Sequence, residues 1–280
     1  MVDGYKVVTC SPVGRKRYVE IQVKYLLQLR DIIDKHIFWI NTKVEEDLEY
    51  FDNLIKQYPD FFEKKELDDD PNFQKSLNVG RFYKYYTDKN TVYCKIDDDI
   101  VFMELSKFEE FIRFRIKNPQ YFLVFANTIN SGLSYFLHNK CGAFDLNPFP
   151  GVSYDSMNEA WRNFSYAKFC FQQLQKRLLE GSLERFHFKN WIMSDYERHS
   201  INFISWLGSE FAKIDTWGLD DELWLTVYKP GERMMPNVIF GEFVVAHYAF
   251  FTQREKLDDD PSVLKFFSDL SNSVERKNPA

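Results

Sequence analysis

Short apolar runs alternate with longer amphipathic segments along this chain, and the alternation constrains the fold more than any other feature. We expect strands at four runs of β-branched and aromatic residues: 5–11, 36–42, 61–67 and 91–96. The segments 18–33 and 44–58 between them have helical periodicity, and the second begins with acidic residues, as the helix dipole favours. This order predicts an α/β fold with crossover helices.

The same alternation continues in the second half of the chain. We expect further strands at 100–103 and 120–130, and helices at 78–90, 103–119 and 165–181. A Pro- and Gly-rich stretch at 144–154 predicts a long loop that could fold over a site. Because no composition shift marks a boundary, we interpret residues 1–280 as a single domain.

Composition limits the partners and the compartment. A net charge of -6 and a pI near 5.5 argue against a nucleic-acid binder, which needs a basic surface for phosphates. The aromatic share of 18% predicts a ring-rich core. The cysteines at 10, 94, 141 and 170 form no CxxC pair, so we expect mostly buried free thiols in a reducing compartment. No apolar stretch reaches the ~20 residues of a membrane span, which predicts a soluble, cytoplasmic protein.

Three consecutive carboxylates interrupt the apolar stretch VYCKIDDDIVF at 92–102. The same triplet occurs at 68–70 and 258–260, each time as LDDDP, where we expect solvated loop charges. Asp97 and Asp99 instead lie at the end of a predicted strand, where open α/β sheets bind ligands, and alternation points them to one side. A divalent ion such as Mn²⁺ or Mg²⁺ would relieve their repulsion and could share a substrate's phosphates. The alternative is a surface turn, which the apolar flanks disfavour.

The segment KIDDDIVF resembles the DxD motif of nucleotide-sugar-dependent glycosyltransferases with the GT-A fold. In that family, strand-end aspartates hold the metal on the donor diphosphate. The resemblance implies a Rossmann-like nucleotide-binding half at 5–104, an acceptor-binding half at 105–255 and a tail at 256–280. Together with HYAFFTQR, the segment is similar to the small soluble glycosyltransferases of chloroviruses, large algal DNA viruses whose enzymes build capsid N-glycans.

That resemblance implies a set of site residues. Asp221 would be the catalytic base, with Asp220 as second choice and Glu222 as third, although the same residues suit a helix N-terminus. His247 would complete a metal site with Asp97 and Asp99, the alternative being a satisfied core histidine. Further positions implied to contact the donor diphosphate are Asp98, Gln253 and Arg254.

The resemblance also places the nucleotide across the ends of the first two strands. The residues implied there are Thr9, Ser11, Pro12, Val13 and Asn41, with Arg81 as a phosphate contact. Each of them is also ordinary loop chemistry. Sugar-stacking roles are open to four tryptophans that also suit a core: Trp161, Trp191, Trp206 and Trp217. The chain has no Gly-rich GxGxxG or GxxxxGK[ST] loop, which disfavours a dehydrogenase or a P-loop NTPase.

The leading interpretation is a metal-dependent, inverting glycosyltransferase that moves a sugar from a UDP-sugar to an oligosaccharide or glycoprotein hydroxyl. The resemblance favours UDP-xylose as donor. Two alternatives stay open: a metal-dependent phosphohydrolase or nuclease, which would need a second carboxylate cluster, and a non-catalytic carbohydrate-binding protein of the same fold. The sequence leaves the acceptor, a retaining outcome and the oligomeric state open.

Overall fold

A computed structural model describes residues 1–66, 79–152, 160–214 and 220–277 of the chain. The described strands form one nine-stranded mixed sheet in the order β3-β2-β1-β4-β8-β6-β9-β5, with β7 also paired to β9. Their bounds are β1 Lys6–Val13, β2 Lys35–Ile40, β3 Phe62–Glu66, β4 Thr91–Ile96, β5 Ile100–Met103, β6 Val124–Ile129, β7 Trp191–Met193, β8 Phe203–Leu207 and β9 Asn237–His247.

The N-terminal half has Rossmann-like topology. Strands β3, β2, β1 and β4 are parallel neighbours, and helices α1 (Lys16–Gln28) and α2 (Glu45–Gln57) cross between them. Both helices present an apolar stripe to the sheet, and their buried residues include Tyr18 and Leu26 from α1 and Phe51 from α2. The predicted α/β class with a mixed central sheet is therefore confirmed.

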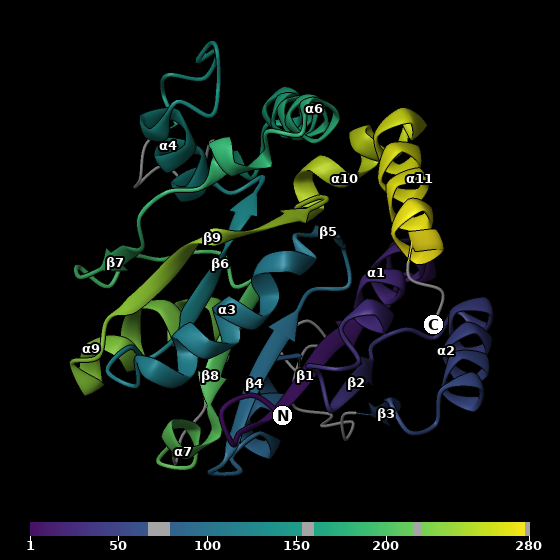
Figure 1. Cartoon of the computed structure of the whole chain (residues 1–280), viewed down its shortest axis with the longest axis vertical. Coiled ribbons are helices and arrows are strands. Elements are labelled where there is room, and N and C mark those ends of the chain that lie inside the picture. The colour runs from purple at the N-terminus through teal and green to yellow at the C-terminus, as the bar shows by residue number, and fades with distance from the viewer. Residues whose placement is uncertain (67–78, 153–159, 215–219, 278–280) are drawn as a thin grey trace.

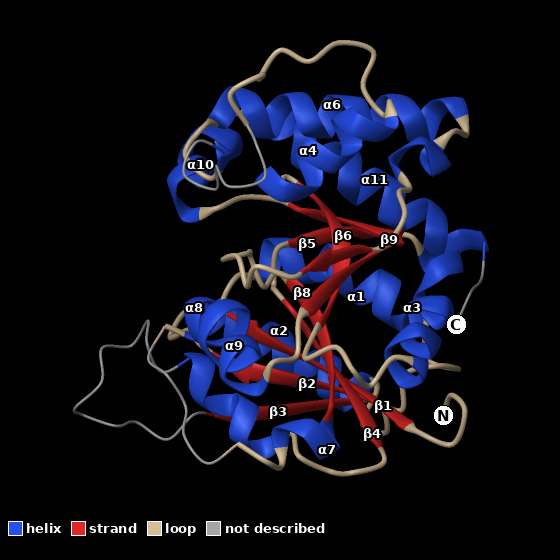
Figure 2. Cartoon of the chain, turned by 90° about the vertical axis from the view of Figure 1, so that its left-hand side faces the viewer, coloured by secondary structure: helices blue, strands red, loops and turns tan. Residues whose placement is uncertain are grey.

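The remaining helices complete the layers on the sheet. They are η2 Val79–Tyr85, α3 Leu105–Lys117, α4 Gly132–Cys141, α6 Phe164–Glu180, η3 Leu183–Phe186, α7 Gly208–Phe211, α8 Asp221–Leu223, the π-helix η4 Trp224–Tyr228, α9 Lys229–Arg233, α10 Phe251–Asp258 and α11 Pro261–Lys277. Figure 1 shows α1 and α2 beside the parallel strands and α11 along α1. Figure 2 shows α4, α6 and α10 gathered at one end of the sheet.

The turn at residues 97–99 carries the chain from one half of the sheet to the other. Strand β4 lies between β1 and β8, whereas β5, which follows directly, pairs with β9 at the far edge. The predicted boundary at residue 104 therefore lies just after a strand that belongs by pairing to the C-terminal half. The acidic triplet occupies the crossing point between the two halves.

The core has two parts, one on each face of the sheet. The larger packs α1, α3, α6 and α11 against the strands, and the smaller packs η2, α7 and η4 on the opposite face. The smaller core is the ring-rich region that the composition predicts: Trp206 stacks on Phe211 with centroids 4.8 Å apart and on Tyr93 at 5.8 Å. Trp206 is thus a core residue and has no exposed face for a sugar.

Several predicted boundaries shift by a few residues. Strand β1 continues to Val13, through residues expected in a loop, because hydrogen bonds to β2 extend along it. Helix α1 ends at Gln28, five residues before the predicted end. Three cysteines are buried, whereas Cys141 is exposed, and all four are free thiols. In the described part of the chain, no helix has the length and apolar character that crossing a bilayer requires.

Candidate functional site

The acidic turn is held in place by backbone hydrogen bonds from three strands. The Asp97 amide donates to the Asn202 carbonyl before β8 (2.9 Å), and the Ile100 amide donates to the Asp97 carbonyl (3.1 Å). On the other side, the Tyr248 amide donates to the Asp99 carbonyl (2.8 Å), and the register of β5 with β9 sets Ile100 opposite His247. This register brings the C-terminal histidine to the triplet, 148 positions after Asp99 in the chain.

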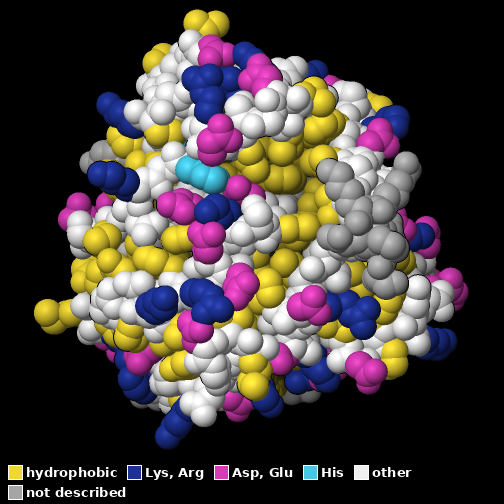
Figure 3. Space-filling view, viewed as in Figure 1, with side chains coloured by type: hydrophobic (Ala, Val, Ile, Leu, Met, Phe, Trp, Pro, Cys, Tyr) yellow, Lys and Arg dark blue, Asp and Glu magenta, His cyan; other side chains and the backbone are white. Residues whose placement is uncertain are grey.

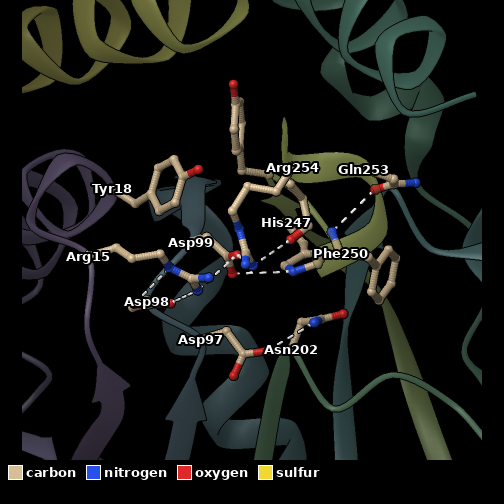
Figure 4. A network of polar contacts seen from close by, with 12 residues as sticks. Arg15, Tyr18, Asp97, Asp98, Asp99, Asn202, His247, Phe250, Gln253 and Arg254 are labelled. Atoms are coloured by element: carbon tan, nitrogen blue, oxygen red, sulfur yellow. Dashed lines mark hydrogen bonds and ion pairs between the residues drawn. The ribbon is translucent and has the colours of Figure 1, made fainter. Parts of the chain in front are cut away.

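Asp99 lies between the imidazole of His247 and the guanidinium groups of Arg15 and Arg254 (Figure 4). Its Oδ1 is 3.2 Å from His247 Nε2, and its Oδ2 is 3.1 Å from Arg15 Nη2 and 3.3 Å from Arg254 Nη2. The side chain is 2% exposed. Burial raises the pKa of Asp99, but His247 and the two arginines outweigh that effect and lower the pKa well below its usual value, so the carboxylate is ionised.

Asp97 has different neighbours from Asp99. Its Oδ1 contacts the ammonium of Lys95, and its Oδ2 accepts a hydrogen bond from Asn202 Nδ2 at 3.0 Å. Lys95 is buried and also donates to the Ile201 carbonyl at 2.9 Å. Burial lowers the pKa of Lys95, but Asp97 and Asp221 raise it above its usual value, so the ammonium stays charged.

Asp97, Asp99 and His247 form the group that could hold a metal ion among the described residues. One ligand atom from each lies within 4.8 Å of the others. Two carboxylate oxygens and one imidazole nitrogen suit Mn²⁺, which accepts both donor types, better than Mg²⁺, which prefers oxygen alone. The His247 Nδ1 atom is buried and has no hydrogen-bond partner among the described residues. The residue types and their spacing therefore fit the predicted metal site.

Asp98 is bound by Gly14 and Arg15, which follow β1. Its Oδ2 accepts from the Gly14 amide (3.0 Å) and Arg15 Nε (3.1 Å), and its Oδ1 contacts Arg15 Nη2. Both carboxylate oxygens are thus bound by the loop that joins β1 to α1. Asp98 holds Arg15 beside Asp99, and it does not face the cluster that could hold an ion.

The acidic motif 220–222 divides into two parts. Asp220 caps helix α8 by accepting from the Leu223 amide (3.0 Å), and Arg198 pairs with both Asp220 (3.2 Å) and Glu222 (2.7 Å). Asp221 is half-buried, and its carboxyl is electrostatically coupled to Lys95 and Asp97. Burial raises the pKa of Asp221, and the nearby Asp97 adds to the rise while Lys95 opposes it. Burial also raises the pKa of Glu222, and Arg198 opposes that rise, so the pKa values of both Asp221 and Glu222 are raised.

The predicted nucleotide-binding residues lie on both faces of the sheet. Thr9 is fully buried and bonds His36 Nδ1 (2.7 Å), and Ser11 is fully buried and donates to Gln22 (3.2 Å). With Val13, which packs in the larger core, these side chains are covered by α1, so the expectation that they contact a nucleotide is wrong for the side chains. Pro12 is half-buried and Asn41 is exposed. The side chain of Arg81 lies outside the described residues.

Arg254 and Gln253, adjacent in the chain, have different surroundings. Arg254 reaches Asp99 and the Ala249 carbonyl, and its Nε atom is buried with no hydrogen-bond partner among the described residues. Gln253 is fully buried and exchanges hydrogen bonds with Asn130, so it does not reach a diphosphate. Asn130 has a positive φ of 68° and also donates to the His247 carbonyl (3.3 Å). This amide pair fixes the end of β9, where His247 lies.

The other tryptophans and acidic triplets are placed as follows. Trp191 is 37% exposed on β7, Trp161 is half-buried against Phe251, and Trp217 lies outside the described residues. The triplet 68–70 also lies outside them. The expectation of free loop charges is wrong for Asp258, which ends α10 and accepts from Arg17 (2.6 Å) and the Tyr18 hydroxyl (3.0 Å). It is wrong because the turn from α10 to α11 packs on α1.

Three residues of the site were not predicted from the sequence: Arg15, Lys95 and Asn202. Lys95 left a signal, because it is a charged side chain inside an otherwise apolar strand. Arg15 lies two residues after the end of β1, in the segment GRKR, and its position near a strand end could have indicated a site residue. Asn202 left no local signal, because it reaches the site only through the pairing of β8 with β4.

Two cavities lie beside helix α1. One of about 420 Å³ is lined by residues 14–17, at the start of α1, and by Glu20, Glu46 and Asp47. A larger one of about 660 Å³ lies between α1, α2 and α11, and Tyr248, which follows His247, is among its lining residues. On the face seen in Figure 3, basic and acidic side chains are interspersed. That face therefore offers no continuous basic surface for a nucleic-acid backbone.

No protein-family model matches this sequence, and no curated protein matches it. Solved structures with a partly similar arrangement include 4-diphosphocytidyl-2C-methyl-D-erythritol synthase from Anaerococcus prevotii, with a TM-score of 0.47 and 12% identity over 94% of this chain and 100% of that one. A second is CMP:2-keto-3-deoxy-manno-octonic acid synthetase, with a TM-score of 0.47 and 6% identity over 93% and 98%. Because both TM-scores are below 0.5, these similarities carry no argument about activity.

Proposed function

We propose that this chain is a metal-dependent glycosyltransferase that moves a sugar from a nucleoside diphosphate sugar to an acceptor hydroxyl. One observation carries the proposal. Three segments far apart in the sequence meet beyond the carboxyl end of β4: the acidic turn, the 220–222 motif and the end of β9. They supply two carboxylates and an imidazole for an ion, and a separate carboxylate with a raised pKa.

The protein's own groups have defined parts in this proposal. Asp97, Asp99 and His247 would hold the ion, which when bound offsets negative charge on the departing diphosphate. Arg254 and Arg15 lie on the two sides of Asp99, where their guanidinium groups can reach phosphate oxygens. Pro12 and Asn41, at or near the ends of β1 and β2, are available to seat the nucleoside.

Asp221 would take the proton from the acceptor hydroxyl. A carboxylate with a raised pKa is a better base than an ordinary aspartate, provided that it remains ionised at the working pH. The buried ammonium of Lys95 favours the ionised form of Asp221, whereas Asp97 disfavours it. This arrangement supports direct attack on the anomeric carbon and hence inversion. The choice of UDP-xylose as donor and of a glycan acceptor rests on the resemblance to chlorovirus-type enzymes alone.

The test is a binding and product assay with a panel of donors. We expect calorimetry to show Mn²⁺ binding by the chain, and UDP-sugars or GDP-sugars to bind only when Mn²⁺ is present. With an acceptor, the nucleoside diphosphate should be released in the same amount as the glycoside formed. If none of the nucleotide sugars binds with Mn²⁺ present, the proposed function is wrong.

The phosphohydrolase alternative has less support. It would use two ions and therefore a second carboxylate cluster. Among residues 1–66, 79–152, 160–214 and 220–277, one group of ligands with metal-binding spacing is found. Release of inorganic phosphate from simple esters would favour this alternative over glycosyl transfer.

A further inference from the structure

Asn202 lies directly across from the acidic turn. Its carbonyl accepts the Asp97 amide (2.9 Å), which extends the antiparallel pairing of β4 and β8 by one hydrogen bond. The residue is 6% exposed. Its side chain lies beside that of Asp97 in Figure 4. The fold therefore delivers a buried amide to a carboxylate that belongs to the metal-ligand group.

The orientation of this amide follows from its neighbour. An ionised carboxylate only accepts hydrogen bonds, so the Nδ2 group of Asn202 must face Asp97 Oδ2, at 3.0 Å. The Oδ1 atom then points away and is buried, without a hydrogen-bond partner among the described residues. Of the two polar groups of the side chain, only Nδ2 makes a hydrogen bond among the described residues, and its acceptor is Asp97.

The other buried asparagines of the described residues are bonded at both ends of the side-chain amide. Asn237 accepts from the Leu123 amide (3.0 Å) and donates to the Leu225 carbonyl (3.3 Å). Asn127 donates to the Phe186 carbonyl (2.9 Å), and its Oδ1 lies 2.6 Å from His138 Nε2. Such residues provide hydrogen bonds to the backbone and side-chain groups around them. Because Asn202 is bonded at one end only, support of the surrounding structure does not account for it.

We propose that Asn202 is a positioning residue that orients the Asp97 carboxylate toward the bound ion; this rests on the proposed function. Two groups hold Asp97, and they act differently on an ion. Lys95 neutralises the carboxylate and competes with a cation for Oδ1, whereas Asn202 fixes Oδ2 through a neutral donor and leaves the charge available. A neutral hydrogen bond that fixes a ligand without neutralising it is how supporting residues of metal sites raise affinity.

The experiment measures Mn²⁺ affinity directly, with Mn²⁺ alone as the probe. We expect Asn202→Leu, which keeps the side-chain volume, and Asn202→Ala, which removes it, each to weaken Mn²⁺ binding about 10- to 100-fold in an electron paramagnetic resonance titration. If Asn202→Leu fails to fold, Asn202→Ala gives the answer. The matched control is Asn237→Ala, which we expect to lower the melting temperature and leave Mn²⁺ affinity unchanged.

The outcomes separate this inference from the proposed function. If the wild-type chain binds no Mn²⁺, the proposed function fails. If the wild type binds Mn²⁺ and both Asn202 variants bind it equally well, the positioning role of Asn202 is wrong while the metal site stands. Weaker Mn²⁺ binding in both Asn202 variants, with Asn237→Ala at the wild-type affinity, supports the inference.

Discussion

The triplets 97–99 and 258–260 have the same three residues and opposite surroundings. In the first, Asp98 and Asp99 are buried at a turn between two strands, and the Asp97 and Asp99 carboxylates face His247. In the second, the Asp258 and Asp260 side chains are about a quarter exposed, and they pair with Arg17 and Lys168 on other helices.

The different surroundings of the two triplets show which position in the fold allows acidic side chains to bind an ion together. At the rim of the sheet, neighbouring strands fix backbone directions and bring several side chains toward one point. At the junction of α10 and α11, Asp258 pairs with Arg17 of α1 and Asp260 pairs with Lys168 of α6, so the two carboxylates bind separate cations. The position in the fold, and not the residue type, separates a candidate metal site from a set of helix contacts.

The largest expected effect comes from Asp99→Asn. Loss of the central carboxylate removes one of two anionic ligands and leaves Arg15 and Arg254 next to the ion, so Mn²⁺ binding should fall below detection at millimolar ion. Calorimetric titration measures the effect. Asp258→Asn is the control and should bind Mn²⁺ as the wild type does. Equal Mn²⁺ affinity in the two variants would contradict the conclusion that the triplet 97–99, and not the triplet 258–260, binds the ion.

The second prediction concerns Asp221, which interacts electrostatically with Asp97 of the first triplet. We expect Asp221→Asn to lower the transfer rate about 10²- to 10⁴-fold with little change in Mn²⁺ affinity. Because the base must be ionised, the wild-type rate should rise with pH through a pKa above that of an ordinary aspartate. Glu222→Gln is the control, since the Glu222 carboxylate is paired with Arg198. A rate profile for Asp221→Asn with the same acid limb would exclude this base.

The third prediction concerns the pH dependence of stability, to which the buried histidine His138 contributes independently of the two acidic triplets. Burial lowers the pKa of His138 to about 3, far below its value of about 6.5 in an unfolded chain. The unfolded state therefore binds more protons below pH 6.5, and His138 should reduce the free energy of unfolding by up to about 1.4 kcal/mol per pH unit as the pH falls from there toward 3.

Urea denaturation of the wild type and His138→Gln between pH 7 and pH 5 measures this slope. The variant should be less pH-dependent whatever its stability at pH 7. The slope will not vanish, because burial also lowers the pKa of His36 to about 3 and of His199 to about 4. An unchanged slope in the variant would mean that His138 does not contribute to the acid sensitivity.

The smallest expected effect is that of Asp258→Asn on stability. Its carboxylate accepts from Arg17, which is 50% exposed, and from the hydroxyl of Tyr18. A pair so accessible to solvent contributes little, and we expect a loss of about 0.5–1 kcal/mol in the free energy of unfolding by urea titration. A loss of several kcal/mol would show that the second triplet is more than a surface contact between α10 and α1.

Much of the fold could be predicted from local pattern, because periodicity reports which face of an element is buried. The strands at residues 35–40 and 91–96 and the helix at 45–57 all match their predicted elements within a few residues. Sequence reasoning did less well for Thr9 and Ser11. The resemblance to glycosyltransferases implied that these residues contact the nucleotide, but which face of β1 is covered by α1 depends on packing that alternation alone does not reveal.

The sequence by itself determined that acidic residues end the strand 91–96, that a histidine ends a later apolar run, and that an acidic motif begins a short helix. The tertiary structure decided that Asp97, Asp99 and His247 meet, that Asp98 turns to Arg15, and that Asn202 and Lys95 hold Asp97. The physical reason is the pairing of β4 with β8 and of β5 with β9. Those backbone hydrogen bonds join segments more than a hundred residues apart, and local periodicity carries no information about which segments pair.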